Sequence, residues 1–129
     1  MDTNFAAINI VASDLARSIA FYRLLGLDFV IDADHPTHAS AELPNGVHVM
    51  LDAQEAVMQF APTWSPPTGS SRVAFAFDAP SAEAVDALHA ALVNAGYESM
   101  RKPWSAEWGI RYATILDPDG VPADIQASL

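Results

Sequence analysis

The sequence contains no cysteine, so disulfide bonds and thiolate metal sites are excluded and nothing indicates an oxidising compartment. Basic residues are also few: six lysines and arginines stand against 16 aspartates and glutamates, for a formal net charge of −10. Because nucleic-acid binding needs a basic surface that displaces counterions from phosphates, we expect no nucleic-acid partner. The chain lacks a basic, apolar leader and any run of about 18 apolar residues, so we expect no membrane association and a cytoplasmic location.

What the chain does contain is a strand–helix–strand pattern in its first part. Residues 5–12 alternate as a strand, and 13–26 change to helical spacing, with Ser13 or Asp14 as the N-cap and Gly26 as the stop. Three short strands are predicted to follow, the last two of them joined by a tight turn at "PNG": residues 27–32, 38–43 and 47–52.

The same order recurs in the second part. A strand is predicted at 72–79, a helix capped by Ser81 and stopped by Gly96 follows, and three more strands complete it: residues 97–103, 109–116 and 121–126. "LPNGVHVML" and "DPDGVPADI" align with an offset of 74 residues. The chain therefore reads as one domain over 1–129, an internal duplication of a βαβββ unit, with modules at about 4–53 and 71–129 and a Pro-, Gly- and Ser-rich linker loop at about 54–70.

Strand alternation predicts which side chains turn away from the helices, into a cleft. In the fourth strand these are His48, Met50 and Asp52, and in the eighth they are Pro122, Asp124 and Gln126. In the fifth strand Arg72 faces the cleft, whereas Val73, Phe75 and Phe77 face the helix. Asp124 is thus expected to be a cleft residue.

Three segments carry a resemblance to a known family: "VASDLARSIAFYRLLGLDF", "RVAFAFDAPSAEAVDALHAALVNAGYE" and "WGIRYATILDPDGVPADIQ". Together they resemble the vicinal oxygen chelate superfamily, which includes glyoxalase I, extradiol dioxygenases and the bleomycin resistance proteins. The resemblance implies an α+β fold in which two βαβββ modules form a U-shaped mixed sheet around a cleft, commonly completed in a homodimer.

Metal-using members of that superfamily place ligands at four positions, which fall here on Ala7, Met50, Arg72 and Asp124. Of these four, only Asp124 has a side chain that can ligate a divalent metal ion. The positively charged guanidinium of Arg72 would repel such an ion. We therefore expect no metal and no cofactor. The hypothesis is that an ion pair between Arg72 and Asp124 replaces the metal; the alternative is that both side chains point independently into water.

The four histidines differ in what their positions predict. His48 faces the cleft and is interpreted as a general base, a ligand contact or a plain polar wall residue. His35 and His38 have the spacing of a loop ligand pair but lack a third partner, and His89 is expected to be solvated on the second helix.

Aromatic residues suggest the nature of a ligand. Phe60 and Trp64 lie in the linker, and Trp104 and Trp108 lie within "PWSAEWGIR", which ends at Arg111. Flat apolar rings beside a cavity stack on planar or cationic molecules. Trp108 has a second interpretation, packing beneath a dimer contact.

The sequence thus favours a metal-independent protein that sequesters an aromatic or cationic small molecule such as an antibiotic. The alternative is a lyase, isomerase or dioxygenase of the same type, with a non-standard metal site or acid–base work by His48 and Asp124. A third interpretation is a cleft filled by the protein's own side chains.

Overall fold

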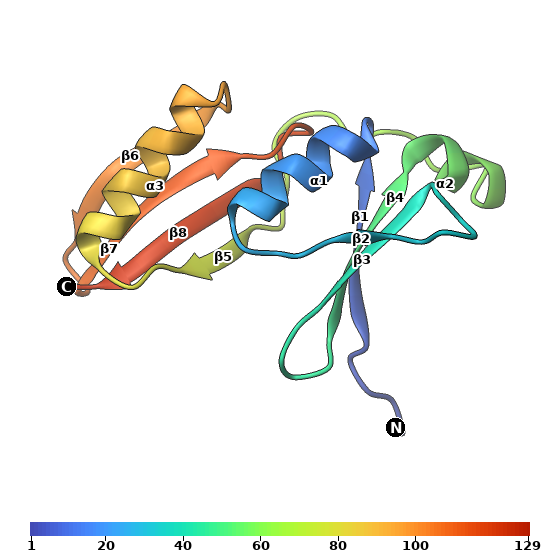
Figure 1. Cartoon of the computed structure of the whole chain (residues 1–129), viewed down its shortest axis with the longest axis horizontal. Coiled ribbons are helices and arrows are strands. Elements are labelled where there is room, and N and C mark those ends of the chain that lie inside the picture. Colours follow the sequence, from blue (N-terminus) through green and yellow to red (C-terminus); the bar gives the residue numbers. More distant parts are fainter. The chain divides into compact units, whose positions relative to one another are not determined.

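The computed structural model describes residues 1–129, and the chain forms two compact units, Met1–Pro66 and Pro67–Leu129. The first unit contains β1 (Ala7–Ala12), α1 (Leu15–Leu24), β2 (Val30–Ile31), β3 (His38–Glu42), β4 (His48–Ala53) and α2 (Gln54–Phe60) (Figure 1). The second contains β5 (Phe75–Asp78), α3 (Ala82–Asn94), β6 (Ser99–Ala106), β7 (Ile110–Leu116) and β8 (Pro122–Ser128).

Each unit has one four-stranded mixed sheet. The strand order is β1-β4-β3-β2 in the first and β5-β8-β7-β6 in the second. In both sheets the first and last strands of the unit pair in parallel, and the remaining neighbours are antiparallel. The predicted α+β class and the two βαβββ modules are confirmed.

Matching turns show the duplication at the level of single hydrogen bonds. In the first unit the amide of Leu43 donates to the carbonyl of Val47 at 2.8 Å. In the second unit the amide of Asp117 donates to the carbonyl of Val121 at 2.9 Å. Sheet register agrees: Met50 lies opposite Asn9, and Asp124 opposite Ala76.

Helix ends follow the local sequence signals. The side chain of Asp14 accepts from the amide of Arg17 at 3.2 Å, so Asp14 is the cap of α1, and Ser81 accepts from Ala84 at 3.1 Å at the start of α3. After α1 and after α3 the chain turns at a glycine with positive φ, 90° at Gly26 and 99° at Gly96. Glycine adopts this conformation without the steric penalty of a Cβ atom, which explains where the helices stop.

The core of each unit lies between a helix and one face of its sheet. In β4 the side chains alternate along the strand: Val49, Leu51 and Ala53 are buried, whereas His48, Met50 and Asp52 are half-buried on the opposite face. Helix α1 contributes the fully buried rings of Phe21 and Tyr22, which meet edge to face with centroids 5.0 Å apart.

Several boundaries differ from the sequence prediction. Residues 54–60 form helix α2 instead of a loop, because the apolar Val57 is buried once β4 ends. β5 begins only at Phe75, so Val73 is 58% exposed and does not join the helix-facing set. Pro122 is buried, not turned toward open space.

None of the three helices combines the length and apolar character that crossing a bilayer requires.

Candidate functional site

The first sheet has a polar face, opposite its buried apolar side. The hairpin of β3 and β4 brings three pairs of residues side by side on it: Glu42 and His48, Ser40 and Met50, His38 and Asp52. We call the surface formed by these six side chains the polar face. Its residues come from alternate positions of two strands, so strand pleating alone places them together.

Two histidines on the polar face have defined partners. Nδ1 of His38 lies 2.6 Å from Oδ1 of Asp52, and the two side chains are 29% and 22% exposed. Nδ1 of His48 lies 3.2 Å from the hydroxyl oxygen of Ser40. Because a carboxylate only accepts hydrogen bonds, the first contact assigns the Nδ1 proton to His38.

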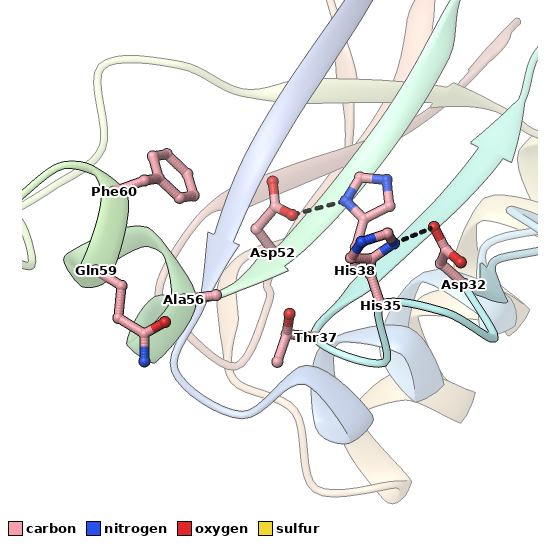
Figure 2. A pocket seen from close by; sticks show the side chains of 8 residues that line it. All are labelled: Asp32, His35, Thr37, His38, Asp52, Ala56, Gln59 and Phe60. Carbon is pink, nitrogen blue, oxygen red and sulfur yellow. Dashed lines mark hydrogen bonds and ion pairs between the residues drawn. The ribbon is translucent and has the colours of Figure 1, made fainter.

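Two pockets adjoin on this side of the unit and share Asp32 and His38. One has a volume of about 500 Å³ and is lined by Asp32, His35, Thr37, His38, Asp52, Ala56, Gln59 and Phe60 (Figure 2). The other has a volume of about 560 Å³ and is lined by Asp28, Val30, Ile31, Asp32, His38, Ser40, Glu42 and His48. No lysine or arginine lines either pocket.

Local hydrogen bonds stabilise the ionised form of Asp32, which lines both pockets. The amide of Asp34 donates to Oδ1 of Asp32 at 2.9 Å, and this bond is the main reason that the pKa of Asp32 lies below its usual value. Partial burial opposes this effect on the pKa, and His35, whose Nδ1 lies 3.4 Å from the other carboxylate oxygen, lowers the pKa further. Asp32 is therefore an anion at neutral pH.

The second sheet carries an aromatic cluster. Trp104 and Tyr112 are register partners on β6 and β7, with ring centroids 4.9 Å apart, and Trp108 meets Trp104 edge to face at 5.5 Å. The guanidinium carbon of Arg101 lies 4.1 Å from the centroid of the Trp104 ring. Nε1 of Trp104 is buried without a hydrogen-bond partner, and Trp108 is 60% exposed. Arg101 thus already occupies the cation position over Trp104.

The hypothesis of an ion pair between Arg72 and Asp124 is wrong. Oδ1 of Asp124 accepts from the hydroxyl of Thr114 at 2.6 Å, and the residue opposite Asp124 on β5 is Ala76. Arg72 precedes β5, is exposed, and lies beside the Asp119–Val121 turn. The sequence pattern predicted a strand that begins at Arg72, whereas β5 starts three residues later, at Phe75.

Arg111 lies on the helix-covered side of its sheet. Its Nε and one terminal nitrogen donate to the two carboxylate oxygens of Asp86 on α3, at 2.9 and 3.0 Å. This bidentate contact lowers the pKa of Asp86 and raises that of Arg111. The guanidinium therefore joins β7 to α3 instead of facing the aromatic cluster.

The remaining predicted contact residues are placed as follows. Phe60 ends α2 and lines the pocket of Figure 2, while Trp64 is half-buried in the turn after that helix, where its amide donates to the carbonyl of Ala61 at 2.9 Å. Ala7 lies opposite His48 in the parallel pair of β1 and β4. His48 and Met50 lie on the polar face.

The sequence analysis predicted that His89 is solvated, and this prediction is wrong. Its Nε2 lies 2.7 Å from the hydroxyl oxygen of Ser99, and the side chain is half-buried between α3 and β6. Burial lowers the pKa of His89 below its usual value; the charge of Lys102 acts in the same direction and that of Asp86 against it.

Acidification should therefore destabilise the protein through His89. The unfolded chain binds this proton with a pKa of about 6.5 and the folded chain binds it less readily, so stability falls as the pH drops below that value. We expect the urea midpoint to fall less between pH 7.5 and 5.5 in His89→Gln than in the unmodified protein. Equal losses in the two proteins would contradict this assignment.

The sequence profile of the Glyoxalase/Bleomycin resistance protein/Dioxygenase superfamily matches residues 4–125. The chain belongs to this superfamily. No curated protein matches the sequence. Solved structures show the same fold: a glyoxalase/bleomycin resistance protein/dioxygenase family enzyme from Burkholderia phytofirmans PsJN has a TM-score of 0.81 at 24% identity, covering 98% of this chain and 100% of its own.

Two further structures agree. A hypothetical protein from S. aureus has a TM-score of 0.81 at 20% identity, covering 98% of this chain and 94% of its own. A glyoxalase-related enzyme from Fulvimarina pelagi has a TM-score of 0.78 at 21% identity, covering 98% of this chain and 88% of its own. These similarities establish the fold.

The residues present do not fit the metal used by many members of the superfamily. Ala7 and Met50 offer no oxygen or imidazole donor, Arg72 carries a positive charge, and Asp124 is engaged by Thr114. No three histidine, aspartate or glutamate side chains anywhere in the chain are arranged to hold a metal ion.

Sequence reasoning missed the contact between His38 and Asp52. The signal was present, because the "PNG" turn centres the hairpin between residues 42 and 48 and thereby sets His38 opposite Asp52. Arg101 and Tyr112 were also missed. They join the aromatic cluster across the irregular pairing of β6 and β7, where the register shifts between Arg101 and Trp104.

Proposed function

We propose that this protein is a metal-independent small-molecule-binding member of the superfamily, whose ligand is a flat organic cation. The observation that carries the proposal is the charge of the two adjoining pockets, which contain no lysine or arginine and four carboxylates: Asp28, Asp32, Glu42 and Asp52. Both arginines of the first unit, Arg17 and Arg23, lie on α1 instead. A group of carboxylates with no lysine or arginine among them attracts a cation.

Apolar side chains beside these carboxylates support a ligand with a hydrophobic body. Val30 and Ile31 on β2 are 69% and 47% exposed, and Phe60 is 73% exposed at the rim of the other pocket. A planar cation buries its ring against such surfaces while its charge faces the carboxylates. Inorganic cations lack that apolar contact.

Binding of the planar acridine cation proflavine tests the proposal. We expect saturable binding by calorimetry and a matching rise in melting temperature, because a ligand that binds only the folded state stabilises it. Bleomycin-type glycopeptides, mitosanes and quinones complete the panel. Glu42→Gln should weaken proflavine binding by about three- to tenfold, since one Coulombic partner is lost at the edge of the site.

Glu98→Gln is the matched control, because this exposed carboxylate lies in the other unit, just before β6. It should leave the dissociation constant unchanged. Equal weakening by both substitutions would indicate unspecific attraction to an acidic protein, and no saturable binding of any panel compound would overturn the proposal.

The enzymatic alternative based on His48 and Asp124 has less support. Each of these side chains is hydrogen-bonded to a hydroxyl group, that of Ser40 for His48 and that of Thr114 for Asp124. A histidine that is oriented by a carboxylate occurs elsewhere, at His38.

A further inference from the structure

We propose that His38 and Asp52 form a metal-independent proton-transfer site, in which His38 is the general base and Asp52 the residue that positions it. This activity goes beyond ligand binding and uses none of the four residues at the superfamily's metal positions. It rests on the geometry of the polar face and of the pocket in Figure 2.

The hairpin holds the two groups in place from both sides. His38 begins β3 and Asp52 lies opposite it on β4, so backbone pairing fixes the distance between their Cα atoms before any side-chain contact forms. The side-chain contact is 2.6 Å long and both groups are largely shielded, with 29% and 22% exposed. Charge-assisted hydrogen bonds of this length are strong and orient the imidazole ring.

Asp52 also determines which nitrogen of His38 is basic. The carboxylate accepts the Nδ1 proton, so the lone pair of the neutral ring is on Nε2. When Nε2 takes a proton, the imidazolium that forms is stabilised by the adjacent carboxylate. This is the arrangement by which a carboxylate makes histidine an effective general base.

The surrounding pocket supplies a place for a flat substrate. In Figure 2, Phe60 and Gln59 lie on α2 on one side, the imidazoles of His35 and His38 lie on the other, and Asp52 and Thr37 lie between them. The volume of about 500 Å³ accommodates a single aromatic or conjugated ring. Thr37 and Gln59 carry hydroxyl and amide donors for negative charge that develops on the substrate.

The substrate class is therefore a planar, conjugated molecule with an acidic C–H bond. Nε2 accepts the proton, and the electron pair of the broken C–H bond moves into the conjugated system. The imidazolium then returns the proton to another atom of the same molecule. The net reaction is an isomerisation that consumes no oxidant, reductant or second substrate.

The probe for this base is 5-nitrobenzisoxazole. Its C3 proton passes to Nε2, the C–H electron pair forms the nitrile bond, the N–O bond breaks, and the released phenolate absorbs visible light. We expect saturable turnover on the order of 10²- to 10³-fold above buffer. His38→Gln should reduce the rate to that of buffer, whereas His89→Gln, which belongs to the other unit and lines neither pocket, should retain the full rate.

Asp52→Asn separates positioning from folding. Because Asp52 is proposed to act through His38, we expect kcat to fall about ten- to a hundredfold, KM to stay within twofold, and the pH midpoint of kcat to move. In ¹⁵N spectra the His38 ring should be protonated at Nδ1 in the unmodified protein and lose that preference in the variant. Far-ultraviolet circular dichroism establishes that each variant is folded.

Two results would overturn the proposal. One is turnover by the unmodified protein that does not exceed that of folded His38→Gln. The other is an Asp52→Asn variant with an unchanged pH profile and an unchanged His38 tautomer. Neither result bears on proflavine binding, which is measured separately and rests on the carboxylates of both pockets.

Discussion

Leu51→Ala is expected to lower the free energy of unfolding by about 2 to 5 kcal/mol, the range for truncation of a buried leucine. Leu51 is completely buried in the central strand β4, where Ile10 of β1 and Ala39 of β3 are its register partners. The two neighbouring strands fix the backbone around the resulting cavity, so the site cannot collapse to fill it. Urea unfolding followed by circular dichroism measures the change.

The neighbouring residue provides the control. Met50 is only half-buried and its side chain lies on the polar face, so Met50→Ala should change stability by less than about 1.5 kcal/mol. A loss as large as that of Leu51→Ala would show that the two faces of β4 are equally packed, contrary to the structure.

Asp117→Ala is expected to cost about 2 to 4 kcal/mol, an unusually large effect for a residue in a turn. Asp117 is 4% exposed, and its Oδ1 accepts the amides of Asp119 at 2.8 Å and Val121 at 2.9 Å. Without the carboxylate, two amides beside the last strand lose their acceptor. The turn that starts β8 would then be held only by its backbone hydrogen bonds.

Asp117→Asn tests this mechanism directly, because the amide oxygen can still accept both hydrogen bonds. It should lose less than half as much stability as Asp117→Ala in the same urea measurement, since the acceptor stays but its charge is gone. If alanine and asparagine are equally destabilising, the two amide contacts are not the reason for the effect.

Much of the fold could be predicted because its signals are local. Asp14 and Ser81 cap their helices through contacts only three residues away, and Gly26 and Gly96 mark where those helices stop. The alternation of β4 correctly assigned His48, Met50 and Asp52 to one face. Each of these features depends on a few consecutive residues.

The candidate site was harder to predict, because it depends on pairing between distant residues. Asp124 was assigned to the correct face of β8, yet its partner is Thr114 and not Arg72. The error is one of strand boundary: β5 begins at Phe75, and a shift of a few residues changes which side chains meet. His38 was treated as half of a loop pair although it begins β3.

The sequence by itself determined the class of the protein: its duplicated βαβββ order, its superfamily and the poor match of Ala7, Met50 and Arg72 to a metal site. Tertiary structure decided which polar groups form hydrogen bonds, above all that the side chain of His38 contacts that of Asp52. The physical reason is the sequence separation between the residues that interact. Caps, turns and pleating act within a few residues, whereas a hydrogen bond between two side chains on different strands exists only once sheet register has set the strands opposite each other.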